Sequence, residues 1–398
     1  MNFKYKRVLA LCITATLMLS GCKTNKDTEK NQNFKESNIV EAAAPTKGQT
    51  TETTTEEITE ETPQNPQNET TQETTRAQTE HDTIMDAQNP NNYVSFLFAG
   101  DVCLEEDGFV IDYYDEVGGD LTQCVSPYLL ERMRSADIFM LNHEYSISSR
   151  GSKLDKYYTF RANPSRMSIL KEMSVDIVSL ANNHVYDYGY EAFEDTLRLL
   201  DESGIRRVGA GMNLSEAEQV QYFEVNGIKI GVVSASRAEK YVITPEAKEN
   251  EPGVFWMYDD TRLKEVCQEA DGQCDFLIAY VHWGTEDSCY FEEYQQEIAK
   301  ELVDCGVDAI IGGHPHIVQG MEYIGNVPVL YSLGDFWFNG SDKYSMMVQL
   351  NIYRNGKCEV DIVPCRQKDY GIHYIENEAE QKAFYDYFSE LSYGVIFG

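Results

Sequence analysis

The sequence predicts an α/β fold built on mixed sheet, either as one sheet or as two stacked sheets. From residue 93 onward, short apolar runs typical of strands alternate with segments that carry apolar residues at helical spacing. Two Asn-Gly pairs, Asn226-Gly227 and Asn355-Gly356, each separate two apolar runs and are typical of tight β-hairpins. Alternation of strands and helices favours parallel strands, whereas the hairpins add antiparallel ones.

The elements follow from local pattern. We expect strands at 93–99, 137–141, 176–180, 206–208, 221–225, 228–233, 276–281, 309–311, 327–332, 345–353 and 358–364. We expect helices at 127–134, 164–173, 189–203, 262–270, 294–305 and 378–391. In 189–203 the apolar residues recur every third or fourth position, and Gly204 ends the segment. Asn377 is suited to cap the last helix.

The first 22 residues have the layout of a secretory signal. Three basic residues between positions 4 and 7 precede an apolar run, 8–19, that is too short to span a membrane. The run ends in Leu-Ser-Gly-Cys, which resembles the bacterial lipobox, in which cleavage leaves Cys22 as a lipidated N-terminus. We therefore expect a lipid-anchored protein on the outer face of the plasma membrane. Ordinary secretion, with Cys22 incidental, is the alternative.

Residues 23–92 have a different composition from the rest of the chain. They are rich in Thr, Glu, Gln and Asn and contain too few apolar residues to form a core, so we expect a disordered tether. Of the total charge of −33, the signal contributes +3 and the tether −8, which leaves −28 for residues 93–398. A domain this acidic is unsuited to bind nucleic acid, and it repels a polyanion unless local cations offset its field.

Cysteine usage does not settle the redox state of the domain. Eight of the ten cysteines lie in 93–398, and they show neither a CxxC motif nor a regular spacing. If the protein is exported, disulfides are compatible with its surroundings, and buried free thiols are equally compatible with the pattern. Both alternatives stay open.

Polar residues that bind metals follow most of the predicted strands. These residues are Asp101, Glu144, Asn183, His184, His282, His314 and His316. Because the carboxyl ends of parallel strands meet at one edge of a sheet, the clusters should share a site. Mixed imidazole and carboxylate ligands suit Zn, Mn or Fe, and six donors are enough for two ions bridged by a carboxylate. A single histidine or carboxylate of this kind would be explained equally well as a turn residue or a helix cap.

His314 and His316 form the most suggestive pair. They follow the apolar residues 309–311 and two glycines, which let the backbone turn where it leaves the sheet. In an extended segment, two residues two positions apart point to the same side, and Pro315 stiffens the link between them. The pair is therefore expected to aim at a common point.

Taken in order, these motifs resemble one family. The chain is similar to the CapA family, named for poly-γ-glutamate capsule synthesis, from about residue 94 to about residue 338. The segments that carry the resemblance are GDVCLEED, NHEYSIS, SLANNHVYDYG, HWGTE, GGHPHIVQGME and YSLGDFWF. That family in turn resembles the calcineurin-like metallophosphoesterases. The resemblance implies a four-layer α-β-β-α sandwich with two mixed sheets and a dinuclear metal site at the strand ends.

The resemblance also implies roles for the residues. Asp101, Asn183 and His282 match metal ligands, Glu144 stands where a bridging aspartate is expected, and His314 and His316 match a final pair, one for each ion. His184 matches the acid near the leaving group. In four places the chain departs from the pattern. Cys103 replaces a ligand histidine, His143 replaces a leucine, Glu144 is longer than aspartate, and Asp335 replaces an asparagine.

Asp187 is a candidate for support of a histidine ring, although capping of the following helix is the favoured interpretation.

Two functions of different classes remain. The first is a metal-dependent hydrolase outside the cell that acts on an anionic polymer or ester. The second is a non-catalytic scaffold that binds poly-γ-glutamate, with other capsule synthesis proteins as partners. A solute-binding lipoprotein fits the anchor but leaves the clusters at the strand ends unexplained. The sequence leaves open whether the protein turns over a substrate.

Overall fold

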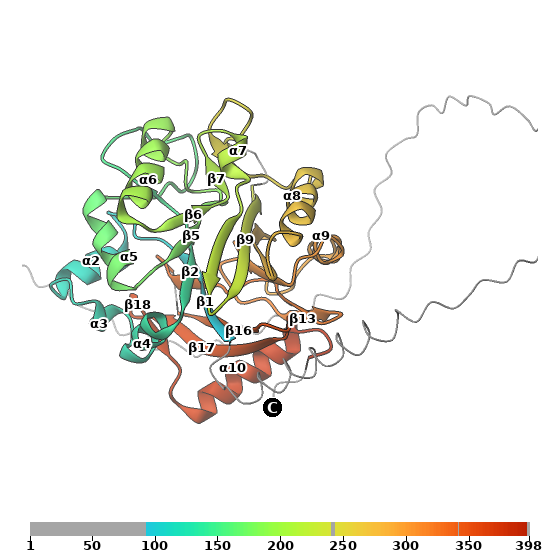
Figure 1. Cartoon of the computed structure of the whole chain (residues 1–398). Helices are drawn as coiled ribbons and strands as arrows, with labels where there is room; N and C mark the ends of the chain where they lie inside the picture. The colour runs from blue at the N-terminus through green and yellow to red at the C-terminus, as the bar shows by residue number, and fades with distance from the viewer. Residues whose placement is uncertain (1–92, 240–242, 341, 396–398) are drawn as a thin grey trace, which may run out of the picture. The chain divides into compact units, whose positions relative to one another are not determined.

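A computed structural model describes residues 93–239, 243–340 and 342–395, and two large sheets form its centre (Figure 1). The first has the order β18-β17-β16-β1-β2-β5-β6, with β15 beside β1. Its strands are β18 (Gly371–Tyr374), β17 (Cys358–Lys368), β16 (Lys343–Tyr353), β1 (Tyr93–Val102), β2 (Ile138–His143), β5 (Ile177–Ser179), β6 (Arg206–Val208) and β15 (Asp335–Trp337).

The second sheet has the order β13-β14-β12-β11-β9-β8. Its strands are β13 (Met321–Ile324), β14 (Val327–Leu330), β12 (Ala309–Gly313), β11 (Phe276–Trp283), β9 (Ile228–Arg237) and β8 (Gln221–Val225).

Helices cover the outer faces of both sheets. They are α2 (Phe109–Glu116), α3 (Leu121–Cys124), α4 (Pro127–Ser135), α5 (Met167–Glu172), α6 (Tyr190–Ser203), α7 (Leu214–Ala217), α8 (Thr261–Asp271) and α9 (Glu293–Asp304). By contrast, α10 (Glu378–Leu391) packs Phe384 and Phe388 with the side chains between the two sheets. A 3₁₀ turn, Pro164–Arg166, precedes α5. In Figure 1, α5 and α6 lie beside the first sheet and α8 and α9 beside the second. As expected, the Asn377 side chain caps α10 by accepting a hydrogen bond from the amide of Glu380.

The buried apolar side chains form three clusters, one between the two sheets and one on the outer face of each sheet. Along β1, Phe96 and Phe98 point into the space between the sheets, where they join Ile278 of β11. Leu97, between them in sequence, points to the opposite face and packs with the helices there. On the second sheet, Leu277 packs with residues of α8 and α9. The arrangement is therefore helix, sheet, sheet, helix, and the expected four-layer α/β sandwich with two mixed sheets is confirmed.

The fold brings the carboxyl ends of its parallel strands to one edge. β1 pairs in parallel with β2, and β2 with β5, while β11 lies in parallel between β9 and β12. The first sheet thus delivers Asp101 from β1, and the second delivers His282 from β11. A Cβ on Gly100 would lie 1.9 Å from the carbonyl oxygen of Gly334, so only glycine allows the close approach of β15 to β1.

The predicted strands and helices are all present, with shifted ends, and the sequence pattern missed only short elements. The missed elements are α2, α3, α7, β13, β15, β18 and four two-residue strands, β3 (Ser146–Ile147), β4 (Arg161–Ala162), β7 (Ala210–Gly211) and β10 (Gly253–Val254). Within the described residues, Cys103, Cys124, Cys267, Cys274, Cys305, Cys358 and Cys365 are free thiols. Within the described residues, no helix combines the length and apolarity needed to cross a membrane. The expected signal peptide, Cys22 and the tether lie outside these residues.

Candidate metal centre

Seven predicted or newly found side chains meet at the edge where the parallel strands end. Their ligand atoms form three overlapping groups, each with atoms within 4.8 Å of one another. The groups are Asp101 with Glu144 and His282, Glu144 with His314 and His316, and Asp101 with His316 and Asp335. Asn183 faces the first group, because its Oδ1 atom lies 2.9 Å from Nε2 of His282. All six residues predicted as metal ligands are therefore together in space.

Glu144 occupies the centre of this cluster and is fully buried. One carboxylate oxygen, Oε2, accepts a hydrogen bond of 2.9 Å from Asn142. The other, Oε1, has no hydrogen-bond partner among the described residues and lies 3.6 Å from Nε2 of His282 and 3.8 Å from Nε2 of His316. Burial, and then the nearby Asp101 carboxylate, raises the pKa of Glu144 well above its usual value. A buried carboxylate oxygen without a partner between two imidazoles fits a metal ion.

Asp101 is held beside Glu144 by its neighbours. The Nδ2 atom of Asn142 donates to Asp101 at 2.8 Å as well as to Glu144, and the backbone amide of His314 donates to Asp101 at 3.1 Å. Burial raises the pKa of Asp101 to about 6. Sequence reasoning missed the role of Asn142, although its place two residues before Glu144 in the same motif was a usable signal.

The segment after β12 differs from the extended conformation that we expected. His314 and His316 have positive φ angles of 96° and 58°, which are rare for residues other than glycine. The segment therefore bends, and the two ring centroids lie 6.0 Å apart. Both rings reach the cluster because of this bend, and strained backbone of this kind is concentrated at functional sites. The expectation that they share one face of an extended segment was wrong.

His316 lies among three carboxylates. Its Nδ1 atom is 2.8 Å from Oδ1 of Asp335 and 3.6 Å from Oδ2 of Asp101. Burial disfavours the charged ring, but Asp335, Glu144 and Asp101 together raise the pKa of His316 to about 10. In the sequence, Asp335 stands out only as a departure from the family pattern, and the structure adds it to the candidate ligands. His314 has the opposite environment: burial and the neighbouring His316 lower its pKa well below the usual value.

His184 and Asp187 form a pair at the same edge, beside the carboxylate cluster. Nδ1 of His184 lies 2.7 Å from Oδ2 of Asp187, which also accepts a hydrogen bond of 2.8 Å from the amide of Phe160. Oδ1 of Asp187 forms an ion pair of 3.0 Å with Lys156. Burial lowers the pKa of His184, and the Asp187 carboxylate acts in the opposite direction. The favoured capping role of Asp187 was wrong, because α6 begins after Gly189 without a side-chain cap.

Cys103 takes no part in these groups. It is fully buried, and burial raises the pKa of its thiol well above the usual value. A thiol that stays protonated is a poor metal ligand, so Cys103 packs as a small apolar residue.

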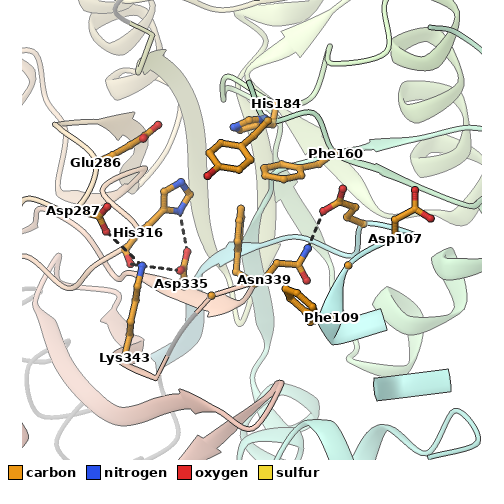
Figure 2. A pocket seen from close by; sticks show the side chains of 15 residues that line it. Asp107, Phe109, Phe160, His184, Glu286, Asp287, His316, Asp335, Asn339 and Lys343 are labelled. Atoms are coloured by element: carbon orange, nitrogen blue, oxygen red, sulfur yellow. Dashed lines mark hydrogen bonds and ion pairs between the residues drawn. The ribbon is translucent and has the colours of Figure 1, made fainter. Parts of the chain in front are cut away.

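A cavity of about 360 Å³ opens onto the cluster. His184, His316 and Asp335 line it, together with aromatic side chains, among them Phe160 (Figure 2). Acidic residues line it as well, and the one lysine among its described lining residues, Lys343, is engaged: Figure 2 shows its contacts with Asp335 and Asp287, at 3.4 and 3.6 Å. The cavity therefore gives a substrate access to the cluster.

Comparison with known proteins places the chain in a family. Residues 95–340 match the family described as "Bacterial capsule synthesis protein PGA_cap", which is more than half of the chain and includes every residue of the cluster. The chain belongs to this family.

Curated relatives carry capsule-related names. The capsule biosynthesis protein CapA of Bacillus anthracis is 30% identical over 69% of this chain and 67% of its own length. The PGA biosynthesis protein CapA of Bacillus subtilis is 28% identical over 69% of this chain and 72% of its own length. Among solved structures, NAD nucleotidase of Haemophilus influenzae is similar, with 13% identity and a TM-score of 0.42 over 76% of this chain and 63% of that one.

The donor set fits a divalent metal ion. It combines imidazole nitrogens with carboxylate oxygens, which first-row metals prefer, and in the part of the chain that the structure describes Oε1 of Glu144 has no hydrogen-bond partner. Three carboxylates gathered in a buried site also require positive charge nearby, and the raised pKa of His316 reflects the same requirement.

Proposed function

We propose that this protein acts in the synthesis or export of a poly-γ-glutamate capsule and binds two divalent transition-metal ions for hydrolysis at the cell surface. Membership of the capsule synthesis family and the names of the Bacillus relatives support the polymer. The Leu-Ser-Gly-Cys sequence at 19–22 supports lipid attachment at Cys22 on the outer face of the plasma membrane. The metal is Mn, Zn or Fe, as the mixed ligands favour.

The observation that carries the hydrolase proposal is the position of Glu144. It belongs to two of the three donor groups, so one carboxylate is able to serve two ions. Asp101, Asn183 and His282 surround one side of it, and His314 and His316 the other. When bound, two such ions would neutralise the oxygens of the substrate and make hydroxide available near neutral pH.

The chain's own residues supply the proton chemistry. Because the Asp187 carboxylate accepts a hydrogen bond, Nδ1 of His184 carries a proton, and the ring is fixed in one orientation. Within the described residues the other nitrogen, Nε2, has no hydrogen-bond partner, and the ring lines the cavity. Nε2 can therefore hold a proton and give it to a leaving group, while Asp187 stabilises the charged ring.

The test is hydrolysis by the full chain loaded with Mn²⁺. The substrates are a phosphomonoester, a phosphodiester and a γ-linked glutamate oligomer, and the variants are wild type, His184→Ala and, as control, His373→Ala on β18. We expect turnover of one substrate class by wild type and the control, and a loss of about 10²–10⁴-fold in His184→Ala. Bound metal without turnover of any substrate would contradict hydrolysis and favour the polymer-binding scaffold.

The anchor has a separate test. Cys22→Ser in the full chain is expected to abolish labelling by palmitate and to release the protein from the membrane fraction. Unchanged membrane association and labelling would contradict lipid attachment at Cys22.

A further inference from the structure

A second cavity, of about 440 Å³, lies beside the first. His314 lines it, His316 lines the first cavity, and Glu286 lines both. The two cavities therefore flank the donor cluster. A chain-like substrate that reached the cluster would extend into both of them.

Arg237 is the cation of this second cavity. It ends β9 directly beside β11, with Ser236 opposite His282 and Arg237 opposite Trp283. Its guanidinium carbon lies 4.3 Å from the ring centre of Tyr294 and 5.7 Å from that of Tyr258. The hydroxyl of Tyr294 accepts a hydrogen bond of 2.7 Å from the amide of Gly284, which fixes that ring. The guanidinium is therefore held in position by aromatic contacts.

Within the described residues, Arg237 forms no ion pair with a carboxylate, although three glutamates, Glu239, Glu286 and Glu292, line the same cavity. Both oxygens of Glu239 are engaged, since Oε1 pairs with Lys156 at 2.8 Å and Oε2 accepts from the amides of Ile243 and Thr244. Glu292 caps α9 and accepts a hydrogen bond of 3.1 Å from Thr285. Arg237 is thus an uncompensated cation in a domain with a net charge of −28.

The two cavities differ in the charge that they offer to a substrate. Lys343 is compensated by Asp335 and Asp287, so the first cavity offers acidic and aromatic groups. Only the second offers a free guanidinium, whose planar fork suits a carboxylate. An anionic group of the substrate therefore belongs beside Arg237.

We propose that Arg237, with Tyr258 and Tyr294, forms a subsite for the α-carboxylate of a γ-linked glutamyl unit next to the donor cluster. This inference rests on the proposed function for its polymer. It also explains how an acidic domain can bind a polyanion, because the guanidinium of Arg237 would pair with a carboxylate of the polymer where the two are in contact. The alternative role of Arg237 is to cover the two tyrosine rings with its aliphatic stem.

The experiment measures binding of a γ-linked glutamate oligomer, and of the same oligomer with its α-carboxylates amidated, to the Mn²⁺-loaded full chain by calorimetry. Arg237→Gln removes the charge, and Arg237→Lys keeps the charge but not the planar guanidinium. Arg198→Gln, at a half-exposed side chain of α6, is the matched control. We expect Arg237→Gln to weaken binding of the acidic oligomer at least about tenfold. The affinity of Arg237→Lys should lie between those of wild type and Arg237→Gln, and the affinity of the control should equal that of wild type. The amidated oligomer should bind all four proteins equally weakly, and the metal content should not change.

Equal affinity of wild type and Arg237→Gln for the acidic oligomer would overturn the subsite, as would tight binding of the amidated oligomer by wild type. Arg237-dependent binding of a phosphomonoester but not of the oligomer would overturn the carboxylate assignment. A failure of the proposed hydrolysis looks different, because turnover is then absent while oligomer binding still depends on Arg237.

Discussion

Two histidine–aspartate–lysine chains reach the first cavity, each through its histidine. In one, His184 contacts Asp187 at 2.7 Å and Asp187 contacts Lys156 at 3.0 Å. In the other, His316 contacts Asp335 at 2.8 Å and Asp335 contacts Lys343 at 3.4 Å. The connectivity is the same, but the environments differ. His184 has a single carboxylate partner and a lowered pKa, whereas His316 lies among three carboxylates and has a pKa raised to about 10.

The difference shows that the number of carboxylates around a histidine ring decides which function the ring is suited to. A ring with one carboxylate partner and a free nitrogen toward a cavity is suited to exchange a proton with substrate. A ring among several carboxylates belongs to a site that requires a cation, whether a proton or a metal ion. We therefore expect His184 to serve turnover and His316 to serve metal binding.

Replacing each histidine should produce the largest and clearest separation. His316→Ala is expected to lose bound metal and, with it, all activity. His184→Ala is expected to retain the metal and lose about 10²–10⁴-fold in turnover, because only the proton transfer is removed. Metal analysis and kinetics on the same samples check both results. Loss of metal from His184→Ala would show that the two chains share one role.

Replacing each aspartate sharpens the comparison. Asp335→Asn should lower metal affinity about 10–100-fold, because it weakens the support of the His316 ring and removes a carboxylate from the cluster. Asp187→Asn should leave metal affinity unchanged and lower turnover instead. Metal titration followed by competition with a chelator measures the affinities. Equal affinities in the two variants would contradict the assignment of Asp335.

Replacing each lysine should have the smallest effect on activity and a measurable effect on folding. The Lys156 side chain is 8% exposed and pairs with the fully buried Asp187, so Lys156→Met should lower the free energy of unfolding by about 3 kcal/mol. Lys343 is 22% exposed, so Lys343→Met should cost about 1 kcal/mol or less. Denaturant unfolding of the two variants beside wild type measures both. Equal losses of unfolding free energy in the two variants would contradict the expectation that the more buried ion pair contributes more to stability.

Much of the site was visible in the sequence because metal-binding residues followed strongly apolar runs. Runs of this kind identify strands, and parallel strands end at a common edge, so Asp101, Glu144 and His282 were expected to meet. The same reasoning identified the longer strands and most helices, whereas the division into two sheets followed only from the family resemblance.

The rest depended on contacts that carry no local signal. Asp335 reaches the cluster because β15, only three residues long, pairs in parallel with β1 and places Asp335 opposite Asp101. Lys156 comes from a loop without a periodic pattern. Arg237 was hidden because β9 was expected to end at 233, whereas it continues to the edge where the site lies.

The most direct test of the central claim is the metal content of the full chain, measured by mass spectrometry on wild type, His314→Ala/His316→Ala and the control His373→Ala. We expect about two equivalents of Mn, Zn or Fe in wild type and in the control, and loss of both from the double variant. Wild-type protein that holds no transition metal after reconstitution would contradict the account.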